Sequence, residues 1–300
     1  MPTELRKFAL IGFGEAGSIL GEDLAAAGRD VVMYDILLDS AASRAAMVDR
    51  ARRAQVRVAD TFDAAVVAAQ VVISAVTASS SAEVAAGAAK TLRAGQVLLD
   101  INSVSPAKKL SNAALLEAAG ADYVEAAVMA PVPPHRLRVP MLLGGKRAHA
   151  LAEELRSVGM NTTALSEQIG VASAVKMCRS IVIKGLEALT VESMLAARRF
   201  GAEREVLESL SGTFPTMGWT EKLPDYLVSR VAEHGRRRAS EMREVARTLE
   251  DVDVEPTMAL AIAARQDWLV DVMNARGISY SSLSSPFSWR DLVDALAEAK

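Results

Sequence analysis

The chain contains Gly12-Phe13-Gly14-Glu15-Ala16-Gly17 directly after the apolar run Phe8–Ile11. In this spacing the first glycine allows a tight turn, the second lets backbone approach a pyrophosphate, and the third lets a helix pack closely on a strand. A helix that begins here presents its positive N-terminal end to the phosphates. The stretch therefore predicts a strand, a dinucleotide-binding turn and a helix, in that order.

An acidic residue follows the next apolar run, Asp30–Tyr34: Asp35 stands 18 residues after Gly17. A carboxylate at this place can accept hydrogen bonds from an adenosine ribose, whereas a 2′-phosphate would meet a like charge. We therefore predict NAD in preference to NADP, with Tyr34 and Asp35 in the cofactor site. The opposing interpretation, that the glycines are only turn residues, is weaker because strand, turn, helix and acid occur in register.

Residues 1–165 alternate short β-branched runs with alanine-rich stretches, a pattern typical of a parallel sheet with crossover helices. Strands are expected at Phe8–Ile11, Asp30–Tyr34, Gln55–Val58, Val71–Val76, Val97–Ile101, Tyr123–Ala126 and Met141–Leu143. No strand is expected after Thr163. We predict an α/β Rossmann domain with a doubly wound, mostly parallel sheet over residues 1–165. An all-α domain for substrate and dimerisation, beginning with a long interdomain helix, is predicted over residues 166–300.

Polar residues follow two neighbouring strands of the expected sheet. Thr77 comes after the fourth strand, and Asn102-Ser103 comes after the fifth. Because the carboxyl ends of parallel strands share one edge, and ligands bind at that edge, Thr77 and Ser103 are predicted to border the nicotinamide.

Composition excludes several classes of partner. The chain has 300 residues with 34 Lys and Arg against 37 Asp and Glu, so its formal charge of −3 gives no reason to expect nucleic acid or a membrane surface as partner. Its one cysteine, Cys178, cannot form an internal disulfide, and no metal site is predicted. The first residues lack a secretory or membrane-spanning run, so we expect a cytoplasmic protein.

The segment around Lys176 is apolar on nearly every side, and we expect it to be buried, with Cys178 in the core. Polar residues nevertheless recur along it at helical spacing: Ser173, Lys176, Ser180, Lys184 and Glu187. Partial burial lowers the pKa of a lysine toward values useful for general acid–base catalysis. For Lys184 we favour a simple ion pair with Glu187, whereas for Lys176 the segment alone leaves both interpretations open.

Three stretches together resemble the β-hydroxyacid dehydrogenase and 6-phosphogluconate dehydrogenase superfamily: the glycine turn, Asp100-Ile-Asn102-Ser103-Val-Ser105-Pro106, and the segment bearing Lys176. The resemblance covers essentially the whole chain. Lys176-Met-Cys-Arg-Ser180, Lys184-Gly185 and Arg236-Arg237-Arg238 are similar to a subgroup whose C-terminal helical domain has no assigned function. The resemblance implies an NAD(P)-dependent dehydrogenase that oxidises the hydroxyl of a small, β-type hydroxy acid. It assigns Lys176 as general acid/base, places Ser103 beside nicotinamide and substrate, and implies a homodimer.

The substrate-binding part departs from the family pattern. The family loop Asp-Ala-Pro-Val-Ser-Gly-Gly is replaced by Glu125-Ala-Ala-Val-Met129-Ala130-Pro131, and the asparagine one turn after the lysine is Ser180. The substrate contacts are therefore expected at Met129, Ala130, Pro131 and Ser180. An anionic substrate also needs a cation, and guanidinium groups suit that task, so Arg237 or Arg238 is a candidate. A solvated basic face at Arg236–Arg238 is an equally good interpretation.

Two other functions stay open at this point. A reductase of imines or keto acids ranks lower because Lys176 is present. A dinucleotide-binding sensor without turnover is suggested by the altered loop, and the lysine in an otherwise apolar helix argues against it.

Overall fold

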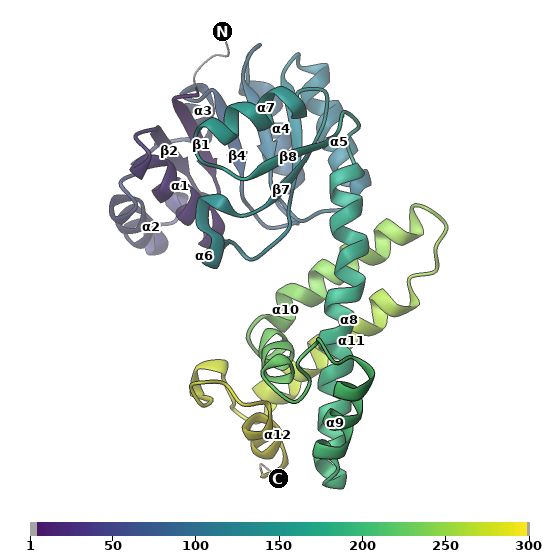
Figure 1. Ribbon diagram of the computed structural model, residues 1–300. Helices are drawn as coiled ribbons and strands as arrows, with labels where there is room; N and C mark the ends of the chain where they lie inside the picture. Colours follow the sequence, from purple (N-terminus) through teal and green to yellow (C-terminus); the bar gives the residue numbers. More distant parts are fainter. Residues whose placement is uncertain (1–4, 299–300) are drawn as a thin grey trace. The chain divides into compact units, whose positions relative to one another are not determined.

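The computed structural model describes residues 5–298 (Figure 1). Its contacts divide the chain into two compact units, Met1–Lys176 and Met177–Lys300. The division falls inside helix α8 (Val171–Phe200), later than the predicted border at 165/166, because the start of this helix is bonded to the sheet. No described helix is both long and apolar enough to cross a membrane.

In the part of the chain that the structure describes, one sheet contains eight strands in the order β3-β2-β1-β4-β5-β6-β7-β8. Their bounds are β1 Lys7–Ile11, β2 Asp30–Tyr34, β3 Arg57–Val58, β4 Val71–Ser74, β5 Val97–Asp100, β6 Asp122–Val128, β7 Met141–Gly144 and β8 Thr162–Ser166. Only the β6–β7 pair is antiparallel. The doubly wound, mostly parallel sheet is confirmed, and its order reverses between β1 and β4, where ligands bind in such sheets.

Strand β8 contradicts the expectation that strands end at Thr163. It pairs in parallel with β7 at the edge of the sheet, and its residues alternate between covered and exposed. The continuous apolar run that marks a strand buried on both faces is therefore missing here.

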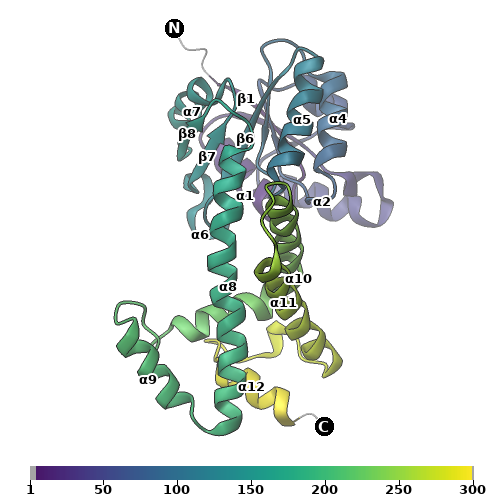
Figure 2. The ribbon, with the colours of Figure 1, turned by 90° about the vertical axis from the view of Figure 1, so that its right-hand side faces the viewer.

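Helices cover both faces of the sheet, so the strands are apolar on both sides. One face carries α1 (Glu15–Ala26), α2 (Ala41–Arg53), α6 (Val132–His135) and α7 (Ala148–Ser157). The other carries α3 (Phe62–Val67), α4 (Ser81–Thr91) and α5 (Pro106–Ala118), of which α4 and α5 lie side by side in Figure 2. Successive residues of β1 enter opposite cores, Leu10 the first and Ile11 the second.

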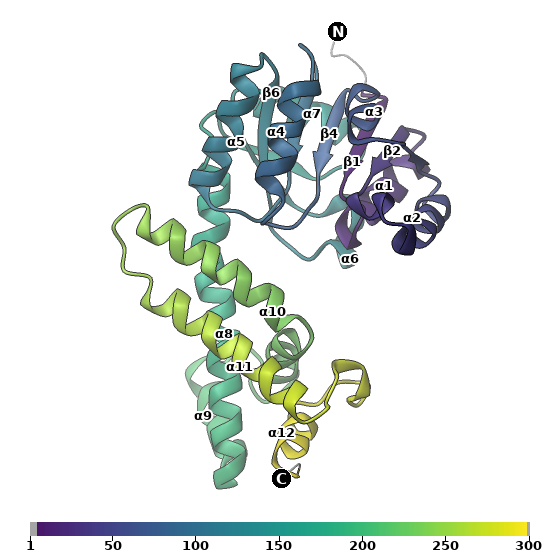
Figure 3. The ribbon, with the colours of Figure 1, turned by 180° about the vertical axis from the view of Figure 1, so that it is seen from behind.

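The second unit is helical, as predicted. After α8 come α9 (Glu203–Thr213), α10 (Leu223–Glu250), α11 (Thr257–Ala275) and α12 (Trp289–Glu298). Short 3₁₀ turns complete the described chain at η1 (Ile36–Asp39), η2 (Arg136–Arg138) and η3 (Tyr280–Ser282). Figure 3 shows α10 and α11 side by side. A Cβ at Gly235 would lie 2.8 Å from the Gln266 carbonyl oxygen, so glycine permits this close approach.

Helix α8 is buried on one side only, which corrects the expectation of burial nearly all round. Val182 is 63% exposed and Leu189 is 59% exposed. Cys178 is also exposed, so its expected place in the core is wrong. The reason is that α10 and α11 pack on the side that carries Lys184 and Ala188.

Candidate active site

The glycine turn joins β1 to α1, and its three glycines have different surroundings. Gly12 has φ +89°, and a Cβ there would lie 2.5 Å from the Ala75 carbonyl oxygen, so the turn packs against the chain that follows β4. A Cβ on Gly17 would collide with the Gly12 carbonyl oxygen. A Cβ on Gly14 would meet nothing within 4 Å. The open space therefore lies beside Gly14 at the N-terminal end of α1, where a pyrophosphate fits the exposed N–H groups.

Asp35 connects the end of β2 to this turn. Its Oδ2 accepts a hydrogen bond from the Phe13 backbone N–H at 2.7 Å, and its Oδ1 accepts from Leu37 N–H at 3.0 Å. Each carboxylate oxygen can accept a further bond, so ribose hydroxyls remain compatible with Asp35. The Phe13 ring is buried, while Glu15 is exposed in the first turn of α1 and Ala16 is half-buried.

Tyr34, the last residue of β2, is half-buried beside Asp35. Its hydroxyl donates to Asp39 Oδ2 at 2.7 Å. Burial, together with this bond and the charges of Asp39 and Asp35, raises the pKa of Tyr34 to about 12. Tyr34 is therefore a neutral donor at the adenosine end of the predicted site.

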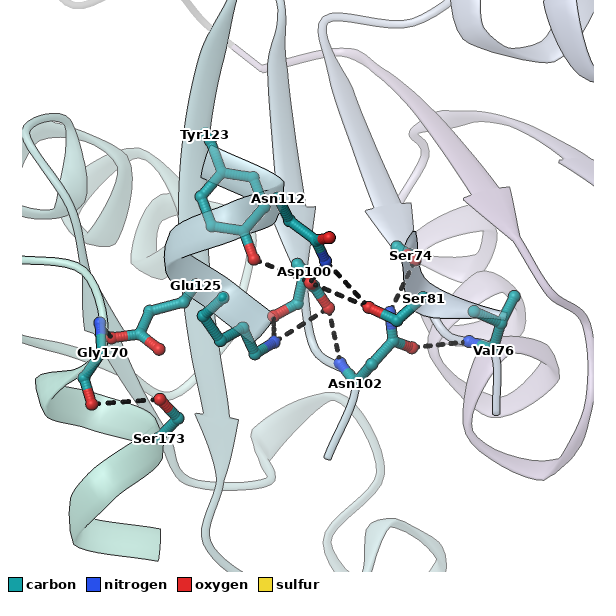
Figure 4. Close-up of polar contacts among 11 residues, drawn as sticks. Ser74, Val76, Ser81, Asp100, Asn102, Asn112, Tyr123, Glu125, Gly170 and Ser173 are labelled. Carbon is teal, nitrogen blue, oxygen red and sulfur yellow. Dashed lines mark hydrogen bonds and ion pairs between the residues drawn. The ribbon is translucent and has the colours of Figure 1, made fainter. Parts of the chain in front are cut away.

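The carboxyl end of β5 holds a buried charged cluster (Figure 4). Lys109 Nζ lies 2.9 Å from Asp100 Oδ1, and both side chains are almost fully buried. The Tyr123 hydroxyl donates to Asp100 Oδ2 at 2.7 Å. Burial alone would raise the pKa of Asp100, but the Lys109 charge and the bonds from Lys109, Tyr123 and the Asn102 N–H outweigh it, and the pKa is lowered. Asp100 is therefore an ionised anchor inside the protein.

Ser103 and Thr77 follow neighbouring parallel strands, β5 and β4, so both lie at the same edge of the sheet. Ser103 is half-buried and Thr77 is exposed. The Thr77 hydroxyl is 2.9 Å from the Ser79 hydroxyl. This arrangement leaves both predicted nicotinamide-side residues open to a ligand.

Lys176 lies in the second turn of α8 and is half-buried. The start of this helix is held by Glu125, a fully buried residue of β6 whose Oε1 accepts from Gly170 N–H at 2.7 Å and Ala172 N–H at 3.1 Å (Figure 4). The carboxylate thus caps a helix from a neighbouring strand. Sequence reasoning missed this role, although an acidic residue within the apolar run 123–126 was an available indication.

The predicted substrate loop follows β6 directly. Met129 N–H donates to the Pro140 carbonyl oxygen at 2.9 Å, which fixes the beginning of the loop. Met129 and Ala130 are half-buried, and Pro131 is exposed. Because the Met129 N–H is already bonded and Pro131 has no N–H, Ala130 is the residue of these three whose N–H can donate to a ligand where the family has Ser-Gly-Gly.

Two buried charged residues of the helical unit, Lys184 and Glu187, form ion pairs with residues of the same unit. Lys184 Nζ pairs with Glu241 at 2.6 Å, so the expected pair with Glu187 is wrong. Glu187 instead accepts two bonds from Arg238, of which Nε–Oε2 measures 2.7 Å. Burial lowers the pKa of Lys184 and raises that of Glu187.

This pairing includes one of the predicted anion contacts. Arg238 is paired with Glu187, and its role as a cation for the substrate stays a prediction. Arg237 is exposed, and Ser180 is half-buried on α8. Arg236 pairs with Asp267 at 3.0 Å and also with Asp271.

Among the described residues, no group of three His, Cys, Asp or Glu side chains could hold a metal ion.

The sheet order and the glycine turn define an α/β dinucleotide-binding protein. Residues 7–163 match the model of the NAD binding domain of 6-phosphogluconate dehydrogenase. The chain belongs to that family, which confirms the resemblance found in the sequence. Residues 197–269 match a domain of unknown function (DUF1932).

Similar proteins extend this result. A conserved hypothetical protein from Sinorhizobium meliloti 1021 is 35% identical, with a TM-score of 0.78 over 100% of this chain and 98% of that one. A conserved protein of unknown function, described as structurally similar to 3-hydroxyacid dehydrogenases, is 32% identical, with a TM-score of 0.71 over 88% and 97% of the two chains. Human mitochondrial 3-hydroxyisobutyrate dehydrogenase is 24% identical over 202 residues, which span 67% of this chain and 59% of the human enzyme.

The surroundings of the glycines predict opposite effects for two alanine variants. Gly14→Ala adds a methyl group to open space at a backbone angle that alanine adopts, so the urea midpoint stays unchanged while the Kd for NADH rises at least about tenfold. Gly17→Ala forces α1 away from the turn and lowers the free energy of unfolding by about 1–3 kcal/mol. Circular dichroism and NADH fluorescence titration measure both. Unchanged NADH binding by Gly14→Ala would contradict a pyrophosphate at this place.

Removing Lys109, the ion-pair partner of Asp100, is expected to lower the free energy of unfolding by an amount that depends on pH. Lys109→Met leaves a buried carboxylate without its counter-charge, which costs about 3–5 kcal/mol at neutral pH. In the wild type the lowered pKa of Asp100 contributes stability above the ordinary value of 3.8, and this is lost as pH falls through the folded-state pKa.

In Lys109→Met the burial of Asp100 favours the protonated carboxyl, so the deficit against wild type shrinks in acid. Urea unfolding by circular dichroism across pH measures this, with the exposed Lys90→Met as the control. A deficit that is constant with pH would show that packing alone is lost.

Proposed function

We propose that the protein is an NAD-dependent dehydrogenase that oxidises the hydroxyl of a small hydroxy acid. The observation that carries this proposal is the bond between Glu125 and the start of α8. It attaches the turns that bear Lys176 to the same sheet whose carboxyl edge bears the glycine turn and Ser103. When bound, NAD supplies the hydride acceptor.

Lys176 and Ser103 supply the proton chemistry and the orientation in this proposal. As the C–H hydride leaves the carbinol carbon, Lys176 Nζ accepts the hydroxyl proton, and a carbonyl group forms. Ser103 holds the same oxygen by a hydrogen bond. The Ala130 N–H, in the loop that follows β6, receives the anionic group of the substrate in this proposal, while contacts from Ser180 and Arg237 stay predictions from the sequence.

The preference for NAD rests on Asp35. A carboxylate that already accepts two backbone bonds can accept ribose hydroxyls, but it repels a 2′-phosphate. We also propose a homodimer, supported by exposed apolar residues at seven-residue spacing on α8, Val175, Val182 and Leu189.

The cofactor preference predicts that NADH binds at least about tenfold more tightly than NADPH, a difference of about 1.4 kcal/mol. Fluorescence titration with each nucleotide at low salt, where exposed charges are least screened, measures the ratio. Tighter binding of NADPH would overturn the assignment of Asp35 to the ribose.

The catalytic assignment predicts that Lys176→Ala lowers kcat by about 100-fold or more, because the proton acceptor is lost, while the Kd for NADH stays unchanged. NADH formation is measured against β-hydroxy acids, sugar acids and their phosphates, with the exposed Lys90→Ala as the matched control.

Undiminished turnover by Lys176→Ala would remove this lysine from the mechanism. Intact NADH binding by the wild type, without turnover of any substrate in the panel, would instead favour the dinucleotide-binding sensor.

A further inference from the structure

We propose that Asn102 is a positioning residue that couples the glycine turn to the edge bearing Ser103. This inference deepens the proposed function and rests on its dinucleotide site. Asn102 follows β5 and stands directly before Ser103. It is almost fully buried, and its side chain bonds to other parts of the sheet unit.

The Asn102 amide bridges β5 to the end of β4. Its Oδ1 accepts a hydrogen bond from Val76 N–H at 2.7 Å, and its Nδ2 donates to the Ser74 hydroxyl at 2.8 Å (Figure 4). Its own N–H donates to Asp100 Oδ1 at 2.9 Å. One side chain thus holds the chain that leads to Thr77, while the buried Asp100 holds Asn102.

The same segment is the surface on which the glycine turn lies. A Cβ at Gly12 would be 2.7 Å from Val76 Cγ1 and 2.5 Å from the Ala75 carbonyl oxygen. The position of Gly12 therefore depends on Ala75 and Val76, and Val76 is held by Asn102. A continuous set of contacts leads from Ser103, through Asn102 and Val76, to the pyrophosphate turn.

In the bridge, the Asn102 amide accepts from Val76 N–H and donates to the Ser74 hydroxyl. In Asn102→Ala the partly buried Val76 N–H loses its acceptor, so the segment shifts or pairs elsewhere, and the turn follows it. In Asn102→Asp the introduced carboxylate lies close to ionised Asp100, and like charges repel. Protonation of the introduced carboxyl removes this repulsion and restores a donor and an acceptor.

The test measures the Kd for NADH by fluorescence and the urea midpoint for wild type, Asn102→Ala, Asn102→Asp and Ser81→Ala. Ser81 is the matched control because it is equally buried in the Asp100 cluster, at 3.4 Å from Asp100 Oδ2 and 3.0 Å from Asn112 Nδ2, and it makes no bond to Val76. Ser81→Ala is expected to lower the urea midpoint and to leave the Kd for NADH unchanged.

Asn102→Ala is expected to raise the Kd at least about fivefold, the lower end of the effect of leaving a hydrogen-bonding group without its partner. Asn102→Asp is expected to bind weakly at neutral pH and to regain affinity relative to wild type as the pH is lowered. An unchanged Kd in Asn102→Ala overturns the coupling. An equal loss in Ser81→Ala also overturns it, because the effect would then be one of general stability.

The readout distinguishes this inference from the proposed function. NADH binding is measured without a substrate, so failure to find a hydroxy acid that turns over leaves the result for Asn102 intact. A wild-type protein that binds NADH while Asn102→Ala binds it equally well overturns the coupling alone. A wild type that binds neither NADH nor NADPH overturns both.

Discussion

The ion pair between Asp100 and Lys109 is the constraint on which the sheet unit depends. Both charges are removed from water at the end of β5, and burying either one alone would cost several kcal/mol. Lys109 also donates to the Asp100 carbonyl oxygen at 2.8 Å, so it fixes backbone as well as charge. The beginning of α5, the end of β5 and Tyr123 of β6 are thereby held together. The segment that bears Ser103 starts from this end of β5, and the predicted substrate loop follows β6.

Much of the sheet unit could be predicted from the sequence because its rules are local. Burial on both faces produces the continuous apolar runs by which β1, β2, β4 and β5 were located, and the glycine spacing marks the turn. Strand β8 lacked that pattern because it lies at the edge. The bond from Val76 to Asn102 could not be predicted either, since it joins residues that are distant in sequence and depends on β4 ending at Ser74.

The helical unit was harder to predict at the level of individual residues. Its helices follow the spacing of apolar residues, but the pairing of its charges depends on which helices pack together. Lys184 and Glu187 lie on one helix at a spacing that permits a bond, yet each finds its partner on α10. Apolar periodicity likewise could not show which side of α8 is exposed, because that depends on the position of α10 and α11.

The hydrogen bonds from the start of α8 to Glu125 also have a consequence for how such proteins can diversify. Lys176 is built into the sheet unit, although it is carried by a helix that continues into the other unit. A recombination point just after Lys176 would exchange the whole of residues 177–300 and leave the proposed proton acceptor attached to the nucleotide-binding half. New helical halves could then be acquired without rebuilding the proposed site of proton transfer, which stays with the sheet unit.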